Sequence, residues 1–463
     1  MNLERDTIAA ISMPPGAGAI GILRLSGPRA ASSAQNCFKP LSPKGLTDHA
    51  PRTLVYGDLL DRDGFPIDRV LCTYSRGPAS YTGEDTAEFH CHGSPMVLSL
   101  GLEALFHAGA RQAQAGEFTR RAFLNGKLDL AQAEAVGDLL EARSRLSARH
   151  AAGQLAGALS RKIGDVYSAL LDVMAHFHAV LDYPDEDIDP FRMEELSAAL
   201  LREEKTLTRL LATCRRGKMI ARGVACAIVG RPNAGKSSLL NALAGFDRAI
   251  VTDIPGTTRD TIEVTAQIGG LPFRFIDTAG LRDSDDPIEQ MGVERSRAAM
   301  EEADLILLVC DQSQPLTAED AALLEQALTL THTILIWNKS DLAGGPVPFL
   351  SLSEERQARL TTVELSARTG AGLEDLEEAL AALFPQEEDG GYGQLLTNQR
   401  QEEAVRRALD SLTRAREALE FGMTPDALLT DVEEALAALG ELTGQAVRED
   451  ITDRIFAKFC VGK

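Results

Sequence analysis

Hydrophobic and polar residues alternate in different ways along the chain, and these changes divide it into four segments. In residues 1–120, short β-like runs such as Thr7–Ile11 are separated by turns rich in Gly and Pro, which is typical of a small α+β domain. Residues 121–219 change to helical periodicity, residues 220–384 alternate strands with helices, and residues 385–463 return to helix. The pattern therefore predicts a multidomain protein.

Two of these segments carry matching apolar seams. In each seam the apolar residues recur at alternating steps of four and three, so one side of the helix is apolar and needs another helix to cover it. The seam residues are Leu159, Ile163, Val166, Leu170, Val173, Phe177 and Val180 in the first segment and Leu428, Val432, Ala435, Leu439 and Leu442 in the second. We therefore predict one all-α domain in two parts, with an α/β domain inserted between them.

A phosphate-binding motif lies near the start of the inserted segment. Gly230–Ser237 fits G-x-x-x-x-G-K-[ST] and follows the apolar run Val224–Val229, which predicts a loop between a buried strand and a helix. The glycines let backbone amides turn inward, Lys236 can reach the β- and γ-phosphates, and the Ser237 hydroxyl is placed to hold Mg²⁺. The residues expected to contact a nucleotide here are Asn233, Ala234, Gly235, Lys236, Ser237 and Ser238.

Three further motifs follow in the order typical of guanine-nucleotide binding. The motifs are Asp277-Thr278-Ala279-Gly280, which suits a sensor of Mg²⁺ and γ-phosphate, Asn338-Lys339-Ser340-Asp341, which suits a guanine reader, and Ser366-Ala367-Arg368, which suits a loop against the base. The Asp341 carboxylate can accept hydrogen bonds from guanine N1–H and from the exocyclic amine together, which adenine cannot offer. The motifs therefore predict GTP rather than ATP.

Charge and cysteine content restrict the class of protein. The 463 residues carry a net charge of −21, yet residues 1–126 balance 12 basic against 12 acidic residues, so the acidic excess lies beyond them. A broad nucleic-acid-binding face is not expected, and a polyanionic substrate would need a local basic patch or a basic partner. Seven Cys without C-x-x-C spacing, a charged start and apolar runs far below ~20 residues predict a cytoplasmic protein with free thiols and no membrane segment.

Three places in the chain allow more than one interpretation. His90, Cys91 and His92 could suggest a metal site, but neighbouring side chains of a strand point to opposite faces. The acidic run Asp182–Pro190 could hold a metal, although a solvated turn is the simpler interpretation because its prolines end the preceding helix. Cys460 could be a redox residue, could serve packing or could lie near a substrate.

Motifs along the whole chain resemble those of the MnmE (TrmE) family of bacterial tRNA-modification GTPases. The matching motifs are Pro14-Pro15-Gly16 with Gly21-Ile22-Leu23-Arg24, Tyr81–Asp85, Arg121–Ala135 and the C-terminal Phe459–Lys463. The resemblance implies an N-terminal α+β folate-binding and dimerisation domain (1–120), an all-α helical domain (121–219 and 385–463) and an inserted α/β Ras-like P-loop G domain (220–384).

The same resemblance implies a function. Family members form homodimers and work with the flavoprotein MnmG to build a 5-carboxymethylaminomethyl or aminomethyl group on the wobble uridine of certain tRNAs. It also implies that Arg24, Glu88, Lys127 and Lys463 contact a 5-formyl- or 5,10-methylene-tetrahydrofolate, the one-carbon donor. These contacts suit the ligand, since a pterin presents an amide and amines to a carboxylate, and its glutamate tail presents carboxylates to Lys or Arg.

GTP hydrolysis needs a substitute for a missing side chain. In Ras-like enzymes a Gln just after Asp-x-x-Gly orients the attacking water, whereas this chain has Leu281 there. The resemblance implies that K⁺ and Glu289 take this role, although from the residues alone Glu289 is an ordinary surface acid. It implies K⁺ contacts at Asn233, Thr252, Ile254 and Thr257, a switch residue on Mg²⁺ at Thr258, and GTP contacts at Thr252, Asp253, Ile254, Pro255, Gly256, Thr257 and Thr258. Pro255 stands where some members have a smaller residue.

Two other functions would fit parts of the sequence. A switch GTPase of ribosome assembly would share the nucleotide motifs, but it would usually carry an appended RNA-binding domain with a basic surface. A folate-dependent enzyme with a regulatory G domain would bind folate without modifying tRNA. The modified nucleosides of tRNA from a deletion strain would separate these functions from tRNA modification.

Overall fold

The computed structural model describes most of the chain and divides it into two compact units. The described residues are 6–14, 16–182, 193–245, 262–277, 297–342, 352–384, 391–422 and 425–444, with Ile455, Phe459 and Gly462. One unit comprises residues 1–140, 154–208 and 403–463, and the other comprises residues 141–153 and 209–402. We describe each unit by itself, and the domain boundaries expected from the sequence stay a prediction.

A seven-stranded sheet forms the N-terminal part of the first unit. Its strand order is β3-β4-β5-β6-β2-β1-β7, and every neighbouring pair is antiparallel except β1 and β7. The strands are β1 (Ile8–Ile11), β2 (Gly18–Ser26), β3 (Phe38–Pro40), β4 (Val55–Leu60), β5 (Pro66–Ser75), β6 (Thr86–Gly93) and β7 (Arg111–Gln112). The helical elements here are α1 (Ala30–Asn36), η1 (Leu46–Asp48) and α2 (Pro95–His107).

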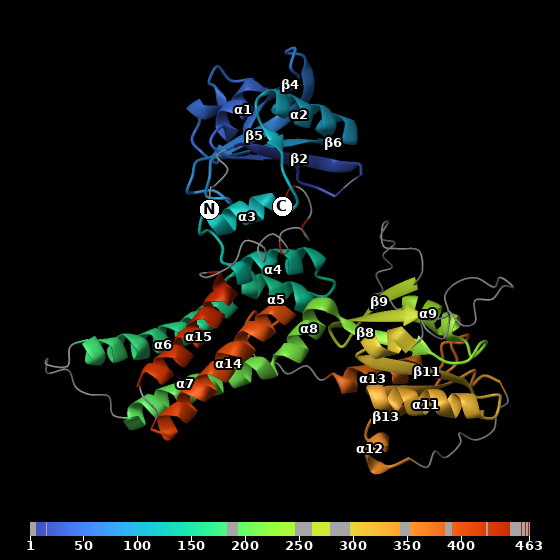
Figure 1. The fold of residues 1–463 in the computed structure, drawn as a ribbon. Helices are drawn as coiled ribbons and strands as arrows, with labels where there is room; N and C mark the ends of the chain where they lie inside the picture. The colour runs from blue at the N-terminus through green and yellow to red at the C-terminus, as the bar shows by residue number, and fades with distance from the viewer. Residues whose placement is uncertain are drawn as a thin grey trace. The chain divides into compact units, whose positions relative to one another are not determined.

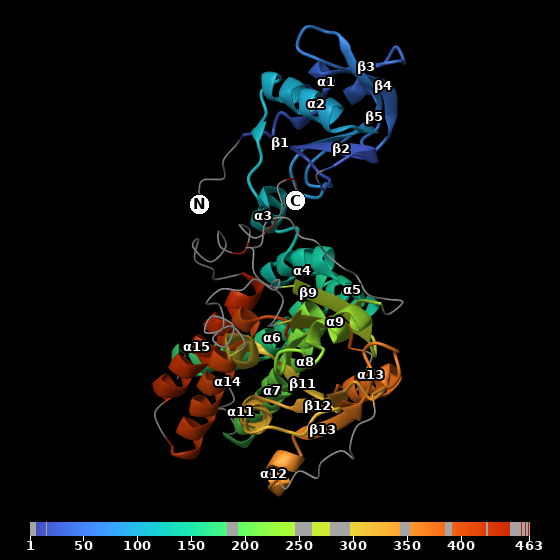
Figure 2. The same cartoon turned by 90° about the vertical axis from the view of Figure 1, so that its right-hand side faces the viewer.

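Helices α1 and α2 cover one face of this sheet (Figure 2). The residues of the covered face form the core with α1 and α2, and they include Leu23, Leu25, Cys72, Tyr74 and Phe89. Because side chains alternate along a strand, the residues between these point to the opposite face. We call that opposite face the helix-free face because neither α1 nor α2 covers it. Helix α3 (Glu117–Leu124) meets its β1–β2 end through Phe118, which packs with Ile8 and Ala10 and lies near Arg24.

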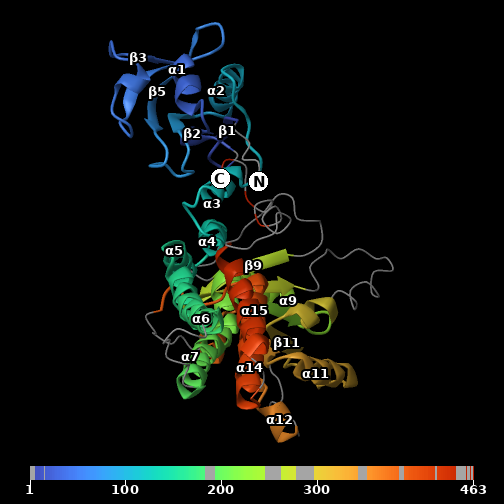
Figure 3. The same ribbon diagram turned by 60° about the vertical axis from the view of Figure 1, so that its left-hand side comes forward.

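Long helices make up the rest of the first unit. They are α3 (Glu117–Leu124), α4 (Leu130–Glu141), α6 (Ala158–Asp182), α7 (Met193–Ala212), α14 (Gln399–Glu420) and α15 (Pro425–Thr443). Helices α6 and α15 pack along one another, and Figures 1 and 3 show them side by side with α7 and α14. The described seam residues of α6 and all five seam residues of α15 are buried, so the predicted pairing of the two seams is confirmed.

A six-stranded sheet organises the second unit. Its order is β13-β12-β11-β8-β10-β9, and all pairs are parallel except β10 and β9. The strands are β8 (Val224–Val229), β9 (Ile262–Ile268), β10 (Leu271–Asp277), β11 (Leu305–Asp311), β12 (Thr333–Asn338) and β13 (Leu360–Glu364). The apolar runs of the sequence predict strands at 224–229, 262–268, 271–276, 304–310, 333–337 and 362–365, which agree with the observed ranges to within about two residues. The fold class expected from the sequence is confirmed: α+β, all-α and inserted α/β Ras-like parts.

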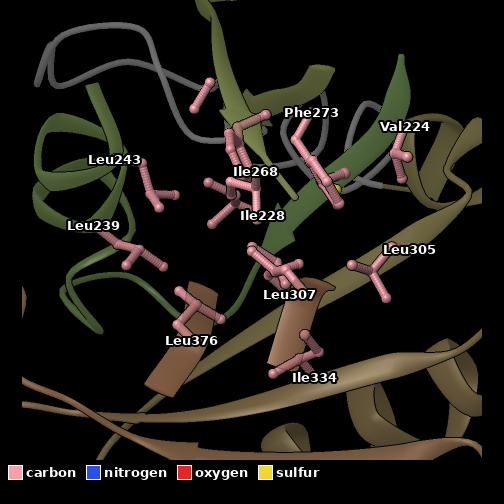
Figure 4. Packing of buried hydrophobic residues seen from close by; sticks show 14 of the residues in the cluster. Val224, Ile228, Leu239, Leu243, Ile268, Phe273, Leu305, Leu307, Ile334 and Leu376 are labelled. Carbon is pink, nitrogen blue, oxygen red and sulfur yellow. The ribbon is translucent and has the colours of Figure 1, made fainter. Parts of the chain in front are cut away.

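Apolar residues fill both faces of this second sheet. One cluster packs β8, β9 and β10 against α9 (Lys236–Ala244) and α13 (Leu373–Leu383), and Figure 4 shows Ile228, Leu239 and Leu376 from these elements meeting in it. The other cluster packs β11 and β12 against α11 (Ala318–Leu330). Strands covered on both sides read as continuous apolar runs, which is why the sequence predicted them well.

Three short helices complete the second unit. They are α5 (Arg145–Leu155), most of which belongs to this unit, α8 (Cys214–Arg222) and α12 (Glu354–Gln357). Among the helices of the described part of the chain, none combines the length and the apolar character that crossing a membrane requires.

Candidate functional site

The phosphate loop connects the end of β8 to the start of α9. Gly230 and Gly235 have positive φ angles of 146° and 98°. A Cβ on Gly230 would lie 2.3 Å from the Val309 carbonyl oxygen, and one on Gly235 would lie 2.2 Å from Asn338 Nδ2. Only glycine fits at both positions, because the backbone must turn and pass close to its neighbours. The sequence thus builds the tight loop that a phosphate group requires.

The side chains of the loop are arranged around its backbone. Lys236 is buried, and its ammonium group donates hydrogen bonds to the carbonyl oxygens of Gly230 (2.7 Å) and Arg231 (2.8 Å). Asn233 is exposed with φ 63°, a left-handed conformation that Asn tolerates better than most residues. Ser237 is exposed in the first turn of α9, where a helix N-terminus favours anions. These groups could hold phosphate oxygens and Mg²⁺.

Asn338 ties three of the predicted nucleotide loops together. Its Nδ2 donates to the carbonyl oxygen of Ala234 at 2.8 Å, and its Oδ1 accepts from the amides of Lys339 (2.8 Å) and Ala367 (3.0 Å). The side chain is only 2 % exposed, so these bonds are made away from water. Asn338 therefore aligns the phosphate loop with the two base-side loops.

Lys339 has a partner that the sequence motifs did not indicate. Its Nζ lies 2.6 Å from Oδ2 of Asp311, the last residue of β11. Hydrogen bonds from Lys339 and Ser313 hold the pKa of Asp311 below its usual value, although burial alone would raise it. Asp311 lies at the carboxyl end of a parallel strand, where the other nucleotide loops also begin. This position could have indicated from the sequence that Asp311 belongs to the site.

Asp341 is held by two donors. Ser366 Oγ donates to Oδ1 at 2.6 Å, and the exposed Arg368 guanidinium donates to Oδ2 at 2.7 Å. The Ser366 hydrogen bond is the main reason that the pKa of Asp341 lies below its usual value. The ionised carboxylate can act only as an acceptor, as a guanine reader must. Ser366 and Arg368 both come from the third predicted motif.

Several predicted site residues lie outside the described part of the chain. They are Thr252, Asp253, Ile254, Pro255, Gly256, Thr257, Thr258, Thr278, Ala279, Gly280, Glu289 and Lys463. The same holds for Leu281, Cys460 and most of the acidic run from Asp182 to Pro190. Asp277 is described and is the last residue of β10, which is paired with β8.

A second polar cluster lies on the helix-free face of the N-terminal sheet. Arg24 on β2 and Glu88 on β6 are register partners, and Arg24 Nε donates to Glu88 Oε1 at 2.8 Å. The Arg24 guanidinium also lies 5.7 Å from the centre of the Tyr81 ring and 5.8 Å from that of Phe118. A carboxylate, a guanidinium and aromatic rings are thus gathered at one place.

Two polar atoms near Glu88 have no hydrogen-bond partner among the described residues. They are Nε2 of His90, 3.8 Å from Glu88 Oε2, and Oγ1 of Thr73, the register partner of Glu88 on β5. Both atoms are shielded from solvent, and buried polar groups normally pair. A ligand with several N–H and carbonyl groups, such as a pterin, fits this set of donors and acceptors. Sequence reasoning missed Thr73, Phe118 and the part played by His90.

Lys127 and the C-terminal tail lie on the same unit. Lys127 is exposed, and its Cγ lies 3.2 Å from the position of a Cβ on Gly83, two residues after Tyr81. The penultimate residue, Gly462, accepts a hydrogen bond from Ser12 Oγ at 2.8 Å. Gly462 therefore lies at the end of β1, beside β2, which carries Arg24.

An ion-pair network supports this part of the first unit. Arg121 is 5 % exposed and lies within ion-pair distance of Asp6 (2.7 Å), Glu117 (2.8 Å) and Glu84 (3.1 Å). Burial alone would raise the pKa of Glu117. Hydrogen bonds from Arg111 and Arg121 lower it by more than burial raises it, so the pKa of Glu117 lies below its usual value. The shifted pKa values of Asp6, Glu117 and Arg121 all favour the charged forms of these residues.

The metal interpretation of His90, Cys91 and His92 finds no support in the geometry. Cys91 lies in the core, while His90 and His92 belong to the alternate face of the strand, as the alternation predicted. Burial raises the pKa of Cys91 to about 12, so its thiol stays protonated. In the part of the chain that the structure describes, no three His, Cys, Asp or Glu residues gather in a way that could hold a metal ion.

Family models match both flanking parts of the chain. The model described as "GTP-binding protein TrmE N-terminus" matches residues 7–127, and the "MnmE helical domain" model matches residues 130–460. The second match spans the inserted α/β segment as well.

Curated relatives match along their whole length. The protein described as "tRNA modification GTPase MnmE" of Chloroflexus aurantiacus is 45 % identical over 99 % of this chain and 100 % of its own length. The protein of the same description from Heliobacterium modesticaldum is 43 % identical over 99 % of each chain. Among solved structures, the G domain of the T. maritima FeoB iron transporter shares 27 % identity over 34 % of this chain and 97 % of its own, with a TM-score of 0.25.

Proposed function

Because the chain belongs to the MnmE family of tRNA modification GTPases, we propose that it forms a 5-carboxymethylaminomethyl or aminomethyl group on the wobble uridine of certain tRNAs, with a tetrahydrofolate derivative as one-carbon donor. The chain is a GTP hydrolase. We further propose that it acts as a homodimer together with the flavoprotein MnmG.

The observation that carries the folate part is the cluster around Glu88. Its carboxylate can accept from the N–H groups of a pterin, while Thr73 Oγ1 and His90 Nε2 are nearby polar atoms that lack partners among the residues the structure describes. We propose that Arg24 and Lys127, with Lys463, pair with the carboxylates of the folate tail. When bound, a 5-formyl or 5,10-methylene derivative would supply the one-carbon unit.

The helix-free face also supports the proposed dimer. It exposes three large apolar side chains on three strands: Ile20 (66 % exposed), Tyr56 (51 %) and Leu71 (37 %). An apolar patch on a sheet otherwise rich in charge is typical of a surface that another protein covers. A second copy of the chain is the occupant that we propose.

The nucleotide loops support a proposal for hydrolysis. Leu281 offers no hydrogen bond to a water molecule, so positive charge and an ordered loop must come from other groups. We propose that Asn233, which lies exposed at the tip of the phosphate loop, holds K⁺ together with Thr252, Ile254 and Thr257, and that Glu289 acts on the water. We propose Ser237 and Thr258 as the Mg²⁺ contacts.

Cation dependence tests the hydrolysis proposal. GTP turnover should be at least several-fold faster in K⁺ than in Na⁺ at equal ionic strength, with saturating Mg²⁺ and GTP. Asn233→Ala should remove most of this difference, whereas Glu289→Ala should lower the rate in K⁺ and leave GTP affinity nearly unchanged. Equal rates of the unmutated protein in the two salts would reject the K⁺ site.

Nucleoside analysis tests the overall function. A strain lacking the gene should lose the modified wobble uridine, and expression of this chain should restore it, as measured by mass spectrometry of digested tRNA. A chain with Glu88→Gln should fail to restore the nucleoside while it keeps GTP hydrolysis. Persistence of the nucleoside in the deletion strain would instead favour a switch GTPase without tRNA-modifying chemistry.

A further inference from the structure

A concentration of positive charge contrasts with the acidity of the chain. It lies in three segments of the second unit, residues 141–153, 209–223 and 391–402, which we call the basic collar. The collar holds nine Lys and Arg against two acidic residues, whereas 40 residues of average composition for this chain would hold about four basic and about six acidic. The local charge therefore has the opposite sign from the whole.

Close contacts make the three segments one body. The amide of Gly393 donates to Nδ1 of buried His150 at 2.9 Å, and the amide of Leu396 donates to Thr213 Oγ1 at 3.4 Å. A Cβ on Gly217 would lie 2.1 Å from the Leu396 carbonyl oxygen, so the third segment passes directly over α8. The collar is thus a packed structure in which the backbones of the three segments hold one another in place.

Four arginines of the collar are exposed and lack an acidic partner within the described part of the chain. Among the described residues, no carboxylate forms an ion pair with Arg145, Arg149, Arg215 or Arg222, and all four side chains are exposed. Lys218 is the contrasting case, since it pairs with Glu402 at 2.6 Å. Elsewhere in the chain, arginines commonly pair with carboxylates at helix–helix contacts.

The positions on the helices place these charges in rows. Arg145 and Arg149 are four residues apart on α5, and Arg215 and Arg222 are seven apart on α8, so each pair lies on one side of its helix. Rows of exposed arginines at helical spacing suit an extended anion better than a single small one.

The basic collar lies too far from the phosphate loop to bind the phosphates of GTP. The collar meets the sheet where β8 begins, next to Gly223, whereas the phosphate loop follows the other end of β8. Six residues of strand separate the two ends, which is ~20 Å of extended chain. That separation is greater than the Debye length at physiological salt, about 8 Å.

A simpler explanation accounts for only part of the charge. Arg222 is in the last turn of α8 and Arg209 in the last turn of α7, where cations stabilise a helix C-terminus. Burial lowers the pKa of His150 to about 4, so this residue adds no charge at neutral pH. Arg145 and Arg215 have no such local role. Arg149 lies 6.0 Å from the centre of the Tyr392 ring, a contact between two segments of the collar that leaves Arg149 exposed.

We propose that the basic collar binds the sugar-phosphate backbone of RNA. The inference rests on the proposed function, since a tRNA-modifying protein of net charge −21 needs a local basic surface to hold a polyanion. Exposed arginines without carboxylate partners can form bidentate hydrogen bonds with phosphate at no cost of broken ion pairs. The expected mode is backbone positioning without base readout.

Charge reversal on α8 tests this surface. The full-length protein is titrated against an unmodified tRNA transcript with a wobble uridine, at KCl concentrations from about 50 to 200 mM. Arg215→Glu with Arg222→Glu should weaken binding at least tenfold and reduce the slope of log K against log salt by about one to two. The same changes at Arg145 and Arg149 should act in the same direction.

A matched control separates the collar from net charge. Arg356→Glu with Arg359→Glu makes the same change in charge on the same unit, at a partly exposed and an exposed arginine that already pair with Glu325 and Glu355. Binding of tRNA by this control should stay within about twofold of the unmutated protein. GTP turnover should be unchanged in both double variants, because neither touches the nucleotide loops.

Other outcomes overturn the proposal. Unchanged tRNA affinity and salt slope in the collar variants, or no tRNA binding by the unmutated chain at about 50 mM KCl, would reject the RNA surface. Unchanged RNA binding with lost binding of a partner protein would assign the collar to an acidic protein surface instead. Restoration of the modified nucleoside by the unmutated chain tests the proposed function separately, so the two failures can be distinguished.

Discussion

The nucleotide loops and the helix-free face of the N-terminal sheet place their polar residues by different means. In the loops, the Asn338 side chain bonds to the backbone of Ala234 and Ala367, which lie 104 and 29 residues away in the chain. On the sheet face, Arg24 and Glu88 are 64 residues apart and meet only because β2 and β6 pair in one register. Both sites therefore depend on the fold, but each nucleotide loop carries a sequence motif of its own, whereas the sheet cluster joins single residues from separate strands.

The single tryptophan provides a way to study the two regions separately. Trp337 is buried in β12 of the second unit, and it is the only Trp in the sequence. Its fluorescence therefore reports unfolding of the α/β part, whereas far-UV circular dichroism reports on the whole chain.

The largest effect is expected from the ion-pair network under the sheet cluster. Arg121→Met removes the buried cation shared by Asp6, Glu84 and Glu117 and leaves only the partly exposed Arg111 to pair with Asp6 and Glu117. The change should destabilise the N-terminal part by about 3 kcal/mol. In urea titrations, the circular dichroism should show a new early transition, while the Trp337 transition should stay in place. A parallel shift of both signals would show that the two regions unfold as one.

The corresponding change in the nucleotide loops is Asn338→Ala. It removes three hydrogen bonds and leaves the backbone groups of Ala234 and Ala367 without their partner, at a cost of about 2 to 4 kcal/mol. Here the Trp337 transition should shift, and GTP affinity measured by titration should fall on the order of 100-fold. Wild-type GTP affinity would contradict the aligning role of this side chain.

A smaller effect is expected from Glu88→Gln on the sheet face. The amide keeps the shape but loses the charge that accepts from a pterin and pairs with Arg24, so affinity for 5-formyltetrahydrofolate should fall by roughly 10- to 100-fold. Asp58→Asn is the control, because Asp58 lies on the same face and pairs with Arg69. Equal losses in both variants would show that the cluster around Glu88 has no special role.

The smallest expected effect concerns Arg368. Arg368 donates a hydrogen bond to one carboxylate oxygen of Asp341. The exocyclic amine of GDP needs that oxygen, so GDP must displace Arg368. IDP has no such amine, so Arg368 can keep its hydrogen bond when IDP binds. Arg368→Ala should therefore raise the ratio of IDP to GDP dissociation constants about two- to fivefold. If the ratio is unchanged while both affinities fall, Arg368 contacts the nucleotide without competing for Asp341.

The sequence by itself determined the nucleotide-binding half of the molecule. Its strands are covered on both faces and are therefore continuous apolar runs, and its loops need glycine at Gly230 and Gly235 because no Cβ fits there. The apolar seams of α6 and α15 could also be predicted, because the spacing of apolar residues shows which side of a helix must be covered. Only the positions and types of residues near one another in the chain were needed.

The tertiary structure alone decided which distant residues share a surface. Thr73 joins Glu88, and Asp311 joins Lys339, through strand register and strand order, which leave no trace in local spacing. The basic collar is the same case, because residues 141–153, 209–223 and 391–402 become one basic body only where Gly393 and Leu396 bond to α5 and to the start of α8. Long-range contacts of this kind depend on the packing of the whole chain. The net charge of the sequence is acidic and therefore could not predict that three separate segments form a positive surface.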